Sequence, residues 1–404
     1  MGTGSPLIGK RINHKFLALL GVIMGLREIS MTMLNPFISI FGRQLVHSNS
    51  FLAGLALGIY GLTNSFFQIP YGVWSDKAGR KKLMILGLIQ LFFGLLLAGL
   101  TSNIYVFIFA RALQGSGAIM GIAYSWVGDI TPVEINNRAM GFVGMIVAPS
   151  AVVAFIAGPI LYQWISLKWM FLGAAGLIGL SLWMMVFFAK ENSVSPAVSA
   201  NPWILFGRTA KNRNLLLISF LGVIYNFIMA SLFFVLPDQF AHYMGIGNLW
   251  MVFAPALAIG VMIMRLGTRD ADAGHFKRVA FFSLFLLGAG FMLLRLPFFF
   301  AIWASAICVM SGYMCMTTIL PSFINGLFPA ERRGSANGIL QTFTFLGFFL
   351  GPTVCGLFIQ QGCPVLIYVS VAFLAVLGIF LLLFIRKTQK EGQFTERESS
   401  KNSC

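Results

Sequence analysis

Long apolar runs, each of roughly 20 residues and so long enough for a membrane helix, follow one another along this chain from Phe16 to Arg386. A helix of that length crosses the roughly 30 Å hydrocarbon core of a bilayer. The runs are apolar on all sides, whereas strands of a membrane barrel would alternate apolar and polar residues. Only 10% of the residues are charged, against about 25% in soluble domains. The sequence therefore predicts an all-α integral membrane protein.

Twelve of these runs are predicted to be membrane-spanning helices. They cover residues 16–41, 51–74, 83–101, 103–127, 138–163, 168–189, 214–241, 248–265, 279–296, 298–328, 335–360 and 364–385. The longest polar interruption separates the sixth run from the seventh and contains prolines and serines. The predicted domains are an N-terminal six-helix bundle over 1–189, a linker over 190–213, a C-terminal six-helix bundle over 214–386 and a disordered polar tail over 387–404.

Short motifs recur in the two halves of the chain. Pro-x-Glu followed by Ala-x-Gly occurs at 132–141 and again at 329–338. Gly158-Pro159 has a counterpart in Gly351-Pro352, and we interpret both pairs as places where the helices bend. Parallel repeats are typical of transporters whose two bundles hold the substrate between them. The repeats therefore predict two pseudo-symmetric bundles with a central substrate site.

The formal charge of +16 is distributed unevenly along the chain. If both termini and every second loop lie on one side, that side holds 23 of the 28 lysines and arginines. The other side holds Arg43, Lys168 and Arg295, while Arg27 and Arg111 fall inside helices. Positive residues are retained in the cytoplasm. The charge thus predicts a multi-pass membrane protein with cytoplasmic termini and linker, and it argues against a nucleic-acid partner.

The loop between the second and third predicted helices carries a dense motif, Gly72-Val-Trp-Ser-Asp-Lys-Ala-Gly-Arg-Lys-Lys. Gly72 would allow close approach of another helix, and Gly79 suits a turn that needs positive φ. Asp76 lies at the membrane edge, where it can accept a hydrogen bond from Arg80 or from the amides of another helix. Lys81 belongs to the basic cluster that holds the loop in the cytoplasm.

This loop resembles the signature loop of the major facilitator superfamily. The segments 58–72 and 111–119 resemble the YajR-like drug:proton antiporter branch of that family. The resemblance extends over all twelve predicted helices and is closest over 56–141. It implies a transporter of twelve helices that exchanges a drug-like compound for protons.

The resemblance also implies a conformational role for the loop. In that family it locks the cytoplasmic side in the outward-open state, and here Asp76 and Arg80 would be joined by Asp129 and by the amino end of the eleventh helix near 335–338. The sequence departs from the branch in two respects. Paired glycines do not follow Gly158-Pro159, and a short polar tail stands where members of the branch often have a soluble domain.

Carboxylates that could carry a proton through the membrane are few. Of the 12 acidic residues, only Glu28 lies deep in a predicted helix. A carboxylate there must pair, face water or be protonated, so Glu28 is either a titrating site or half of a fixed ion pair. Arg27 projects about 100° away on the helix, so we expect each to find a partner on another helix, with Arg111 a candidate for Glu28. Asp238, at the outer end of the seventh helix, would either titrate or remain a water-exposed cap.

Arg111 also resembles the fourth-helix arginine that proton antiporters use to modulate a coupling site. The alternative is a buried donor to backbone carbonyls. The proton-coupling candidates are therefore Glu28, Arg27, Arg111 and Asp238.

Polar residues on several helices are candidates for the substrate cavity: Tyr60, Asn64, Gln68, Gln114, Tyr225, Asn226, Gln341 and Thr344. Three of them are spaced four apart on one face of the second helix, which would either line the cavity or bond another helix. Abundant phenylalanine and methionine would suit an apolar, loosely specified substrate, but any lipid-facing helix contains them as well.

The leading hypothesis is a monomeric secondary antiporter that expels amphipathic compounds or drugs in exchange for protons. Uptake or facilitated diffusion of a metabolite, with the buried charges fixed, is the second. A non-transporting scaffold or sensor is the third, although it would not need a conformational lock. No nucleotide-binding loop, metal-ligand cluster or nucleophile elbow appears in the sequence, so neither an enzyme nor a cofactor is expected.

Overall fold

The computed structural model describes residues 14–131, 136–189, 207, 209–328 and 330–385. In these ranges the chain is almost entirely helical, and the one β-type contact is an isolated bridge between Val46 and Asn103. The first eight helices are α1 (His14–Thr32), α2 (Ile38–Gln44), α3 (Ser50–Ala78), α4 (Arg80–Leu100), α5 (Ile104–Ser116), α6 (Ile119–Ile130), α7 (Asn136–Tyr162) and α8 (Leu167–Phe188). The later helices are α10 (Arg213–Met244), α11 (Trp250–Asp270), α12 (Phe276–Met292), α13 (Phe299–Leu327), α14 (Ala330–Gln360) and α15 (Val365–Phe384).

Eleven helical stretches in the described ranges are long and apolar enough to cross a membrane by length and composition. The pairs α1–α2 and α5–α6 each form one stretch. The longest stretch, Ile246–Arg295, contains both α11 and α12, which meet at residues 271–275 where Gly274 has a φ of 94°. With these two helices counted separately, the arrangement agrees with the twelve predicted spans.

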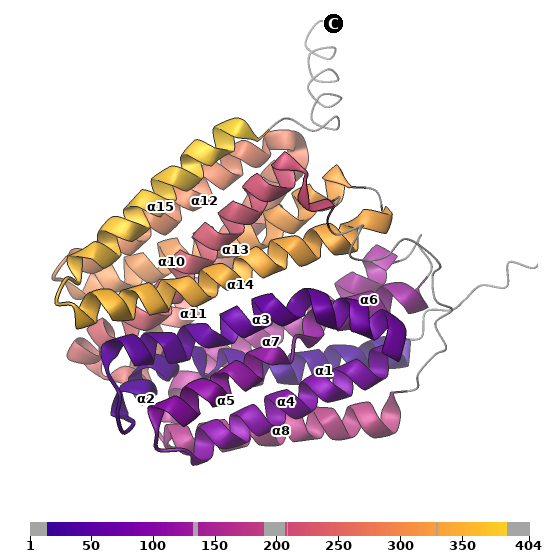
Figure 1. Ribbon diagram of the computed structural model, residues 1–404. Coiled ribbons are helices and arrows are strands. Elements are labelled where there is room, and N and C mark those ends of the chain that lie inside the picture. Colours follow the sequence, from indigo (N-terminus) through magenta and orange to yellow (C-terminus); the bar gives the residue numbers. More distant parts are fainter. Residues whose placement is uncertain (1–13, 132–135, 190–206, 208, 329, 386–404) are drawn as a thin grey trace, which may run out of the picture.

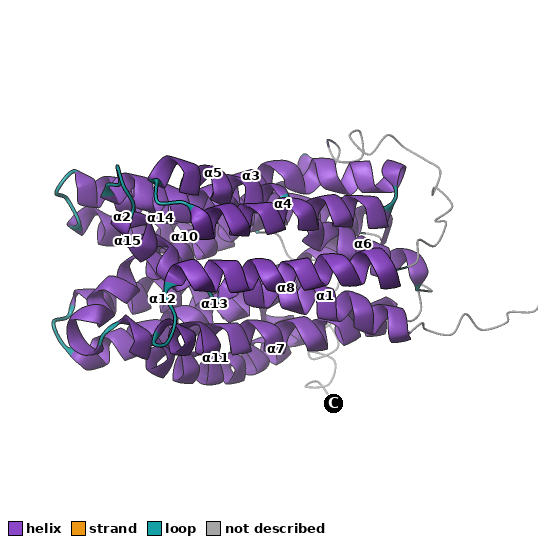
Figure 2. Cartoon of the chain, turned by 90° about the horizontal axis from the view of Figure 1, so that it is seen from below, coloured by secondary structure: helices purple, strands orange, loops and turns teal. Residues whose placement is uncertain are grey.

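The helices form two groups that lie side by side (Figure 1). Helices α1 to α8 pack on one another, and so do α10 to α15. The groups meet chiefly where α3 packs against α14, with a smaller contact between α7 and α11. The long helices lie roughly along one common axis, and the connections between them lie at the two ends of the molecule (Figure 2). The predicted domain boundaries stay predictions, because most of the linker at 190–213 and all of the tail at 387–404 lie outside the described residues.

Local sequence signals fix several helix ends. The side chains of Asn49, Asn103 and Asn212 each accept a hydrogen bond from a backbone amide in the first turn of α3, α5 and α10. Such caps satisfy amides that have no partner within the helix. Between α3 and α4, Gly79 adopts a φ of 101°, which confirms the positive φ predicted for this turn.

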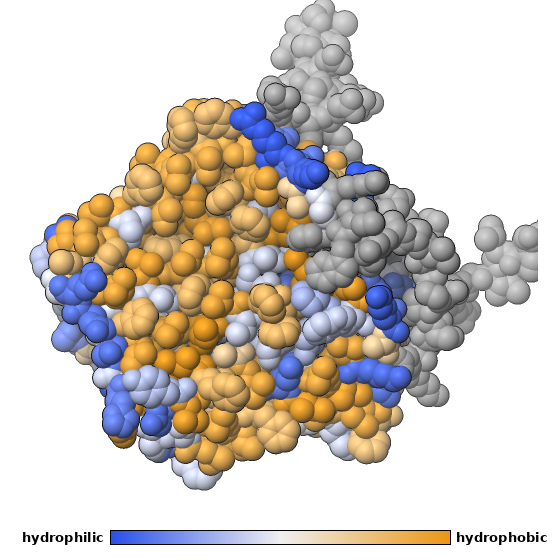
Figure 3. Space-filling model, viewed as in Figure 1, coloured by the Kyte–Doolittle hydropathy of each residue, from blue (hydrophilic) through white to orange (hydrophobic). Residues whose placement is uncertain are grey.

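We call the end that carries Lys77 and the α3–α4 turn the basic end. The opposite end, where the α2–α3 connection lies, is the far end. Between the ends, the outer surface is largely hydrophobic (Figure 3). Large apolar side chains such as Phe187, Phe300 and Leu383 are well exposed on it. A soluble monomer rarely exposes apolar surface on this scale, whereas a bilayer would cover it.

Glycines allow α3 and α14 to touch through their backbones toward the far end. A Cβ atom added at Gly54, Gly58 or Gly61 would lie 2.2–2.6 Å from carbonyl oxygens of Pro352, Phe349 and Phe345, respectively. Small residues permit such close approach of helices in a membrane. The same helix pair is separated at the basic end.

Gly72 behaves differently from the other glycines of α3. The prediction that it permits close helix approach is wrong for this conformation, because an added Cβ there would meet nothing within 4 Å. The glycines of the repeated Gly-Pro pairs do make close contacts. An added Cβ at Gly158 would lie 2.6 Å from the carbonyl oxygen of Met33, and one at Gly351 would lie 2.5 Å from that of Phe227. Gly351 therefore brings α14 against α10, and Gly158 brings α7 against the residue that directly follows α1.

Candidate transport cavity

A cavity of about 2450 Å³ lies between the two helix groups. Its mouth is at the basic end, where Asp76 and Arg80 line one wall and Arg333 and Asn337 line the other. Away from the mouth the cavity reaches Glu28. Both groups contribute to the wall, so a bound molecule would contact the two halves at once. The predicted site between two bundles agrees with this cavity.

The far end of the cavity is closed by contacts between the groups. Arg43 of α2 forms an ion pair with Asp238 of α10, and its guanidinium lies 4.9 Å from the ring centroid of Phe234. Gln163 donates to the carbonyl oxygen of Gly247 at 2.8 Å. Asp238 is paired with Arg43 and lies inside α10, so it does not cap the helix, but its side chain keeps the partial water exposure of the second interpretation. Its titration stays a prediction.

Glu28 and Arg27 pair with each other, so the expectation of a partner on another helix is wrong for Glu28 but holds for Arg27, which also bonds Tyr60 of α3. Arg27 Nη1 lies 3.1 Å from Glu28 Oε2, and Thr32 Oγ1 donates to Glu28 Oε1 at 2.9 Å. The long arginine side chain spans the angle between neighbouring positions on the helix. Arg27 Nη2 also donates to the hydroxyl of Tyr60 on α3 at 2.5 Å. The Glu28 side chain is 22% exposed and that of Arg27 only 6%, so the carboxylate is the more accessible partner.

Arg111 does not contact Glu28, so this candidate pairing is wrong. Its Nε donates to the carbonyl oxygen of Ala56 at 3.3 Å and its Nη1 donates to Gln114. Arg111 is fully buried, with its guanidinium 5.1 Å from the ring centroid of Tyr60. The bond to Ala56 agrees with the alternative interpretation of Arg111 as a buried donor to backbone carbonyls, and the bond to Gln114 adds a side-chain acceptor.

Tyr60 connects several of these groups. Its hydroxyl accepts from Arg27, and its ring faces Arg111. The same ring makes edge contacts with Phe345 and Phe348 of α14, with centroids 6.3 Å apart in both cases. Tyr60 thus lies at the seam between the two groups of helices.

The eight polar cavity candidates divide evenly. Four line the cavity: Tyr60, Gln68, Asn226 and Gln341. The other four, Asn64, Gln114, Tyr225 and Thr344, are buried between helices and do not line it in this conformation. Gln114, for example, binds Arg111, and the hydroxyl-bearing ring of Tyr225 packs on Tyr313. A polar residue in a membrane helix can bond a neighbouring helix instead of facing a substrate, and periodicity alone does not separate the two cases.

Several cavity residues were not singled out from the sequence. Besides Tyr60, the wall includes two further tyrosines, Tyr124 and Tyr313, and seven methionines: Met31, Met120, Met140, Met229, Met264, Met310 and Met314. The spacing of Met310 and Met314, four apart on α13, was a usable signal, since such residues share a helix face. In the part of the chain that the structure describes, no three His, Cys, Asp or Glu side chains group as a metal site would require.

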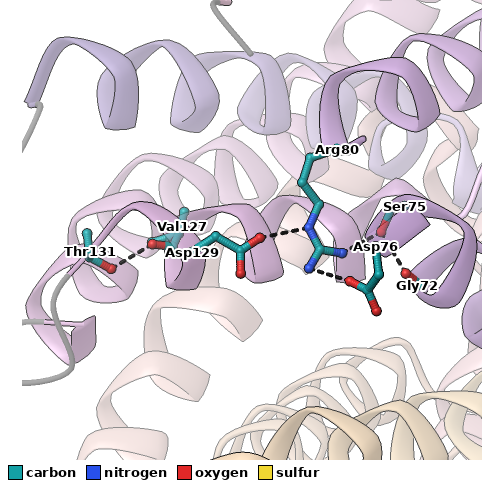
Figure 4. Close-up of polar contacts among 7 residues, drawn as sticks. All are labelled: Gly72, Ser75, Asp76, Arg80, Val127, Asp129 and Thr131. Atoms are coloured by element: carbon teal, nitrogen blue, oxygen red, sulfur yellow. Dashed lines mark hydrogen bonds and ion pairs between the residues drawn. The ribbon is translucent and has the colours of Figure 1, made fainter. Parts of the chain in front are cut away.

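The signature loop forms a compact polar network at the cavity mouth (Figure 4). Arg80 Nη2 lies 2.5 Å from Asp76 Oδ1, and Arg80 Nε donates to Asp129 Oδ2 at 2.8 Å. The expected Asp76–Arg80 contact is therefore present. Arg80 also donates to Ser75, whose hydroxyl donates to the carbonyl oxygen of Gly72. All of these partners belong to α3, α4 and α6, so within the described residues the network does not reach α14.

Lys81 makes its contacts outside the polar network that its neighbours in the loop form. Its Nζ donates to the carbonyl oxygens of Val186 and Ala189 at 2.9 and 2.6 Å. These are carbonyls at the end of α8, which lack amide partners within the helix, and a cation there also complements the helix dipole. Lys81 thus ties α4 to the end of α8 rather than to the mouth of the cavity.

Two groups of membrane-spanning helices around a cavity that opens at one end define a transporter of small molecules. The family model described as Major Facilitator Superfamily matches residues 20–352 and, in a second match, 274–403. The chain therefore belongs to the major facilitator superfamily. It is a multi-pass membrane protein and a transporter, not an enzyme.

Curated relatives and a solved structure agree with this assignment. The inner membrane transport protein YajR of Escherichia coli strain K12 is 29% identical over 92% of this chain and 82% of its own length. The class E tetracycline resistance protein of Escherichia coli is 24% identical over 74% of this chain and 76% of its own length. A bacterial homologue of the human lysosomal transporter Spinster, crystallised in an inward-facing, occupied conformation, superposes with a TM-score of 0.72 at 14% identity, covering 96% of this chain and 99% of the other.

Proposed function

We propose that this protein is a proton-coupled antiporter that exports drug-like or amphipathic compounds across a bacterial inner membrane by alternating access. It acts as a monomer, uses the proton gradient and needs no bound cofactor. The observation that carries the proposal is Glu28, a carboxylate partly exposed to the cavity away from its mouth. One relative is a tetracycline resistance protein, which supports an organic compound as substrate.

The orientation follows from the charges. On the positive-inside rule the basic end, with Lys77, Arg80 and Lys81, faces the cytoplasm, as do both termini. The cavity then opens to the cytoplasm and is closed toward the outside by the contacts at the far end. An exporter needs this conformation in order to collect its substrate.

Glu28 suits an exchange of substrate for proton. Arg27 and Thr32 stabilise the ionised form of Glu28. Protonation removes the charge and with it the cost of keeping a charge in the membrane. A substrate that places a cationic or hydrogen-bond-donating group on Glu28 competes with the proton for the same oxygen atoms. Binding of one therefore favours release of the other, which is the requirement for antiport.

The rest of the wall suits an apolar body of variable shape. Methionine side chains are flexible and polarisable and adapt to different partners, and tyrosine rings offer both a π face and a hydroxyl. Met310 and Met314 lie on the C-terminal side of the cavity, with Tyr124 on the N-terminal side. These groups would surround a compound whose polar end is held at Glu28.

The first prediction tests Glu28 in proteoliposomes. Glu28→Gln should reduce pH-gradient-driven movement of compounds from an amphipathic panel that includes tetracycline to background, while counterflow exchange continues. Glutamine keeps the size of the side chain but cannot carry a proton. Asp238→Asn, the control, removes a membrane-edge carboxylate that lies outside the cavity lining and should still follow the gradient. If Glu28→Gln follows the gradient and Asp238→Asn does not, the proton site is Asp238 and the role given to Glu28 is wrong.

A passive carrier for uptake or facilitated diffusion is the second candidate, and the direct Arg27–Glu28 pair favours it. With a fixed pair, Glu28→Gln would leave Arg27 without a counter-charge. The expected result is then a loss of thermal stability toward the lower end of the roughly 3–5 kcal/mol measured for broken buried pairs, because Glu28 is partly exposed. Transport by the wild type would also be independent of a pH gradient.

A further inference from the structure

A second, smaller cavity lies on the outer surface of the C-terminal group, between α12 and α15. It has a volume of about 490 Å³ and is lined mostly by apolar side chains. Val376 and Leu383 of α15 are 66% and 72% exposed there, and Phe281 of α12 forms the opposite side. The two helices touch more deeply, where an added Cβ at Gly378 would lie 3.1 Å from Leu284. The surface above this contact is left as a groove, within the hydrophobic outer face of the protein.

Cations stand at one end of this groove. Lys277 and Arg278, in the first turn of α12, line it at the basic end. Arg278 is neutralised, because its Nε donates to Asp270 Oδ2 at 2.9 Å and its Nη2 also bonds this carboxylate. His275 contacts the same carboxylate. Lys277 has no hydrogen bond or ion pair among the described residues.

A second cation lies near the same end. The guanidinium of Arg213, at the start of α10, lies 5.9 Å from the ring centroid of Phe384 at the end of α15. No carboxylate among the described residues pairs with Arg213. The apolar groove that runs along the membrane-spanning helices therefore ends, at the membrane edge, at Lys277, a lining cation with no counter-charge among the described residues, while Arg213 lies outside the lining.

We propose that this groove binds an acidic phospholipid from the leaflet at the basic end. One acyl chain lies along Phe281, Val376 and Leu383, and the phosphate lies at Lys277. The apolar lining of the groove matches a hydrocarbon chain. A chain that fills the groove makes closer contact with the protein than lipid that lies loosely over it. The charged part matches a headgroup with net negative charge, because basic residues at this level attract anionic lipids. A zwitterionic lipid fills the same groove without the charge gain.

The test compares two lipids with the same chains, phosphatidylglycerol and phosphatidylcholine, bound to the purified full chain in mild detergent and counted by native mass spectrometry. The wild type should retain phosphatidylglycerol in preference. Lys277→Gln should reduce that preference about fivefold, the effect of about 1 kcal/mol for one basic residue near a membrane surface. Val376→Trp should fill the groove and reduce retention of both lipids.

The matched control is Arg269→Gln. It removes an exposed cation of α11 that also lies at the basic end but outside the groove. This variant should keep the full preference. An unchanged preference for phosphatidylglycerol in Lys277→Gln overturns the proposal. An equal loss of preference in Arg269→Gln also overturns it, because it would show a general attraction of the lipid to basic surface. A cross-linked dimer that Val376→Trp abolishes also overturns it, since a second copy would then occupy the groove. Val376 and Arg269 are exposed and Lys277 is partly exposed, and gel filtration checks that each variant is folded.

Discussion

The two ends of the α3–α14 helix pair differ in how they are held. Toward the far end, glycines of α3 bring the helix backbones into contact, and the Arg43–Asp238 pair joins the groups beside them. At the basic end the polar network of Asp76, Arg80 and Asp129 stays within one group, and Gly72 faces open space. Closure at the far end thus depends on backbone contact, while the basic end keeps its polar groups on one wall of an open cavity.

On the proposed alternating-access mechanism, this difference gives each end a separate contribution. If the far end opens while the basic end closes, the glycine contacts must break and new contacts must form near Gly72. Both changes involve the same two helices, α3 and α14. The comparison therefore predicts that identical substitutions at the two ends of α3 have unequal effects, and the three predictions below use this in order of decreasing effect.

The largest effect is expected for Gly58→Leu. An added Cβ would lie 2.5 Å from the carbonyl oxygen of Phe349, which cannot move without shifting α14. Overpacking of this kind costs about 1–3 kcal/mol, so the ratio of far-end-closed to far-end-open protein should fall by about 5- to 150-fold. Spin labels at Tyr105 and Val365, which are exposed at the far end on different groups, should move apart.

Gly72→Leu is the matched control for this substitution. An added Cβ at Gly72 meets nothing within 4 Å, so the label distance at the far end should stay as in the wild type. If Gly58→Leu keeps the closed-state distance in a folded protein, backbone contact is not what closes the far end.

An intermediate effect is expected for Asp76→Asn. The substitution weakens the bond with Arg80, and hydrogen bonds to charged groups contribute about 1.5–3 kcal/mol. Because Asp76 is half-exposed, we expect the lower end of that range and a roughly tenfold fall in transport rate, with normal membrane insertion. Asp270→Asn, which removes a partly exposed carboxylate at the same end but outside the cavity, should transport normally. Wild-type rates in a well-inserted Asp76→Asn protein would contradict a role for the loop in gating.

The smallest effect is expected at the Arg43–Asp238 pair. Both side chains are about a third exposed, and such pairs contribute about 0.2–1 kcal/mol. Arg43→Gln and Asp238→Asn should each shift the far-end equilibrium by at most about fivefold. The double variant should be no worse than either single one, because the second change removes nothing further. If the two single changes add in their effect on the distance between the spin labels at the far end, the two residues act separately.

Much of the fold followed from the sequence, because apolar runs and loop charges act locally. The signature loop was predicted for the same reason: Asp76 and Arg80 are four residues apart, and Gly79 needs its own φ. The Arg43–Asp238 pair, 195 residues apart, was not found, since no local pattern relates its members. The Arg27–Glu28 pair was missed because helix geometry places the Cα–Cβ bonds but not the end of a long arginine side chain.

The cavity assignments were limited by conformation. Tyr60, Asn64 and Gln68 share one face of α3, yet only Tyr60 and Gln68 line the cavity, and Asn64 between them is buried. Whether a residue on such a face is open depends on which side chains of other helices pack over it in a given conformation, and the spacing of polar residues does not specify that. The prediction for Gly72 failed in the same way, since it describes a contact that this conformation lacks.

The position of Tyr60 bears on how the energy of a proton could reach a moving helix. A ligand shifts a conformational equilibrium only to the extent that it interacts differently with the two states. On the proposed mechanism, protonation of Glu28 weakens its hold on Arg27, which bonds Tyr60, and Tyr60 touches Phe345 and Phe348 on the opposite group. The proton site and the seam between the groups are thus thermodynamically linked through one aromatic side chain, and no long relay is required.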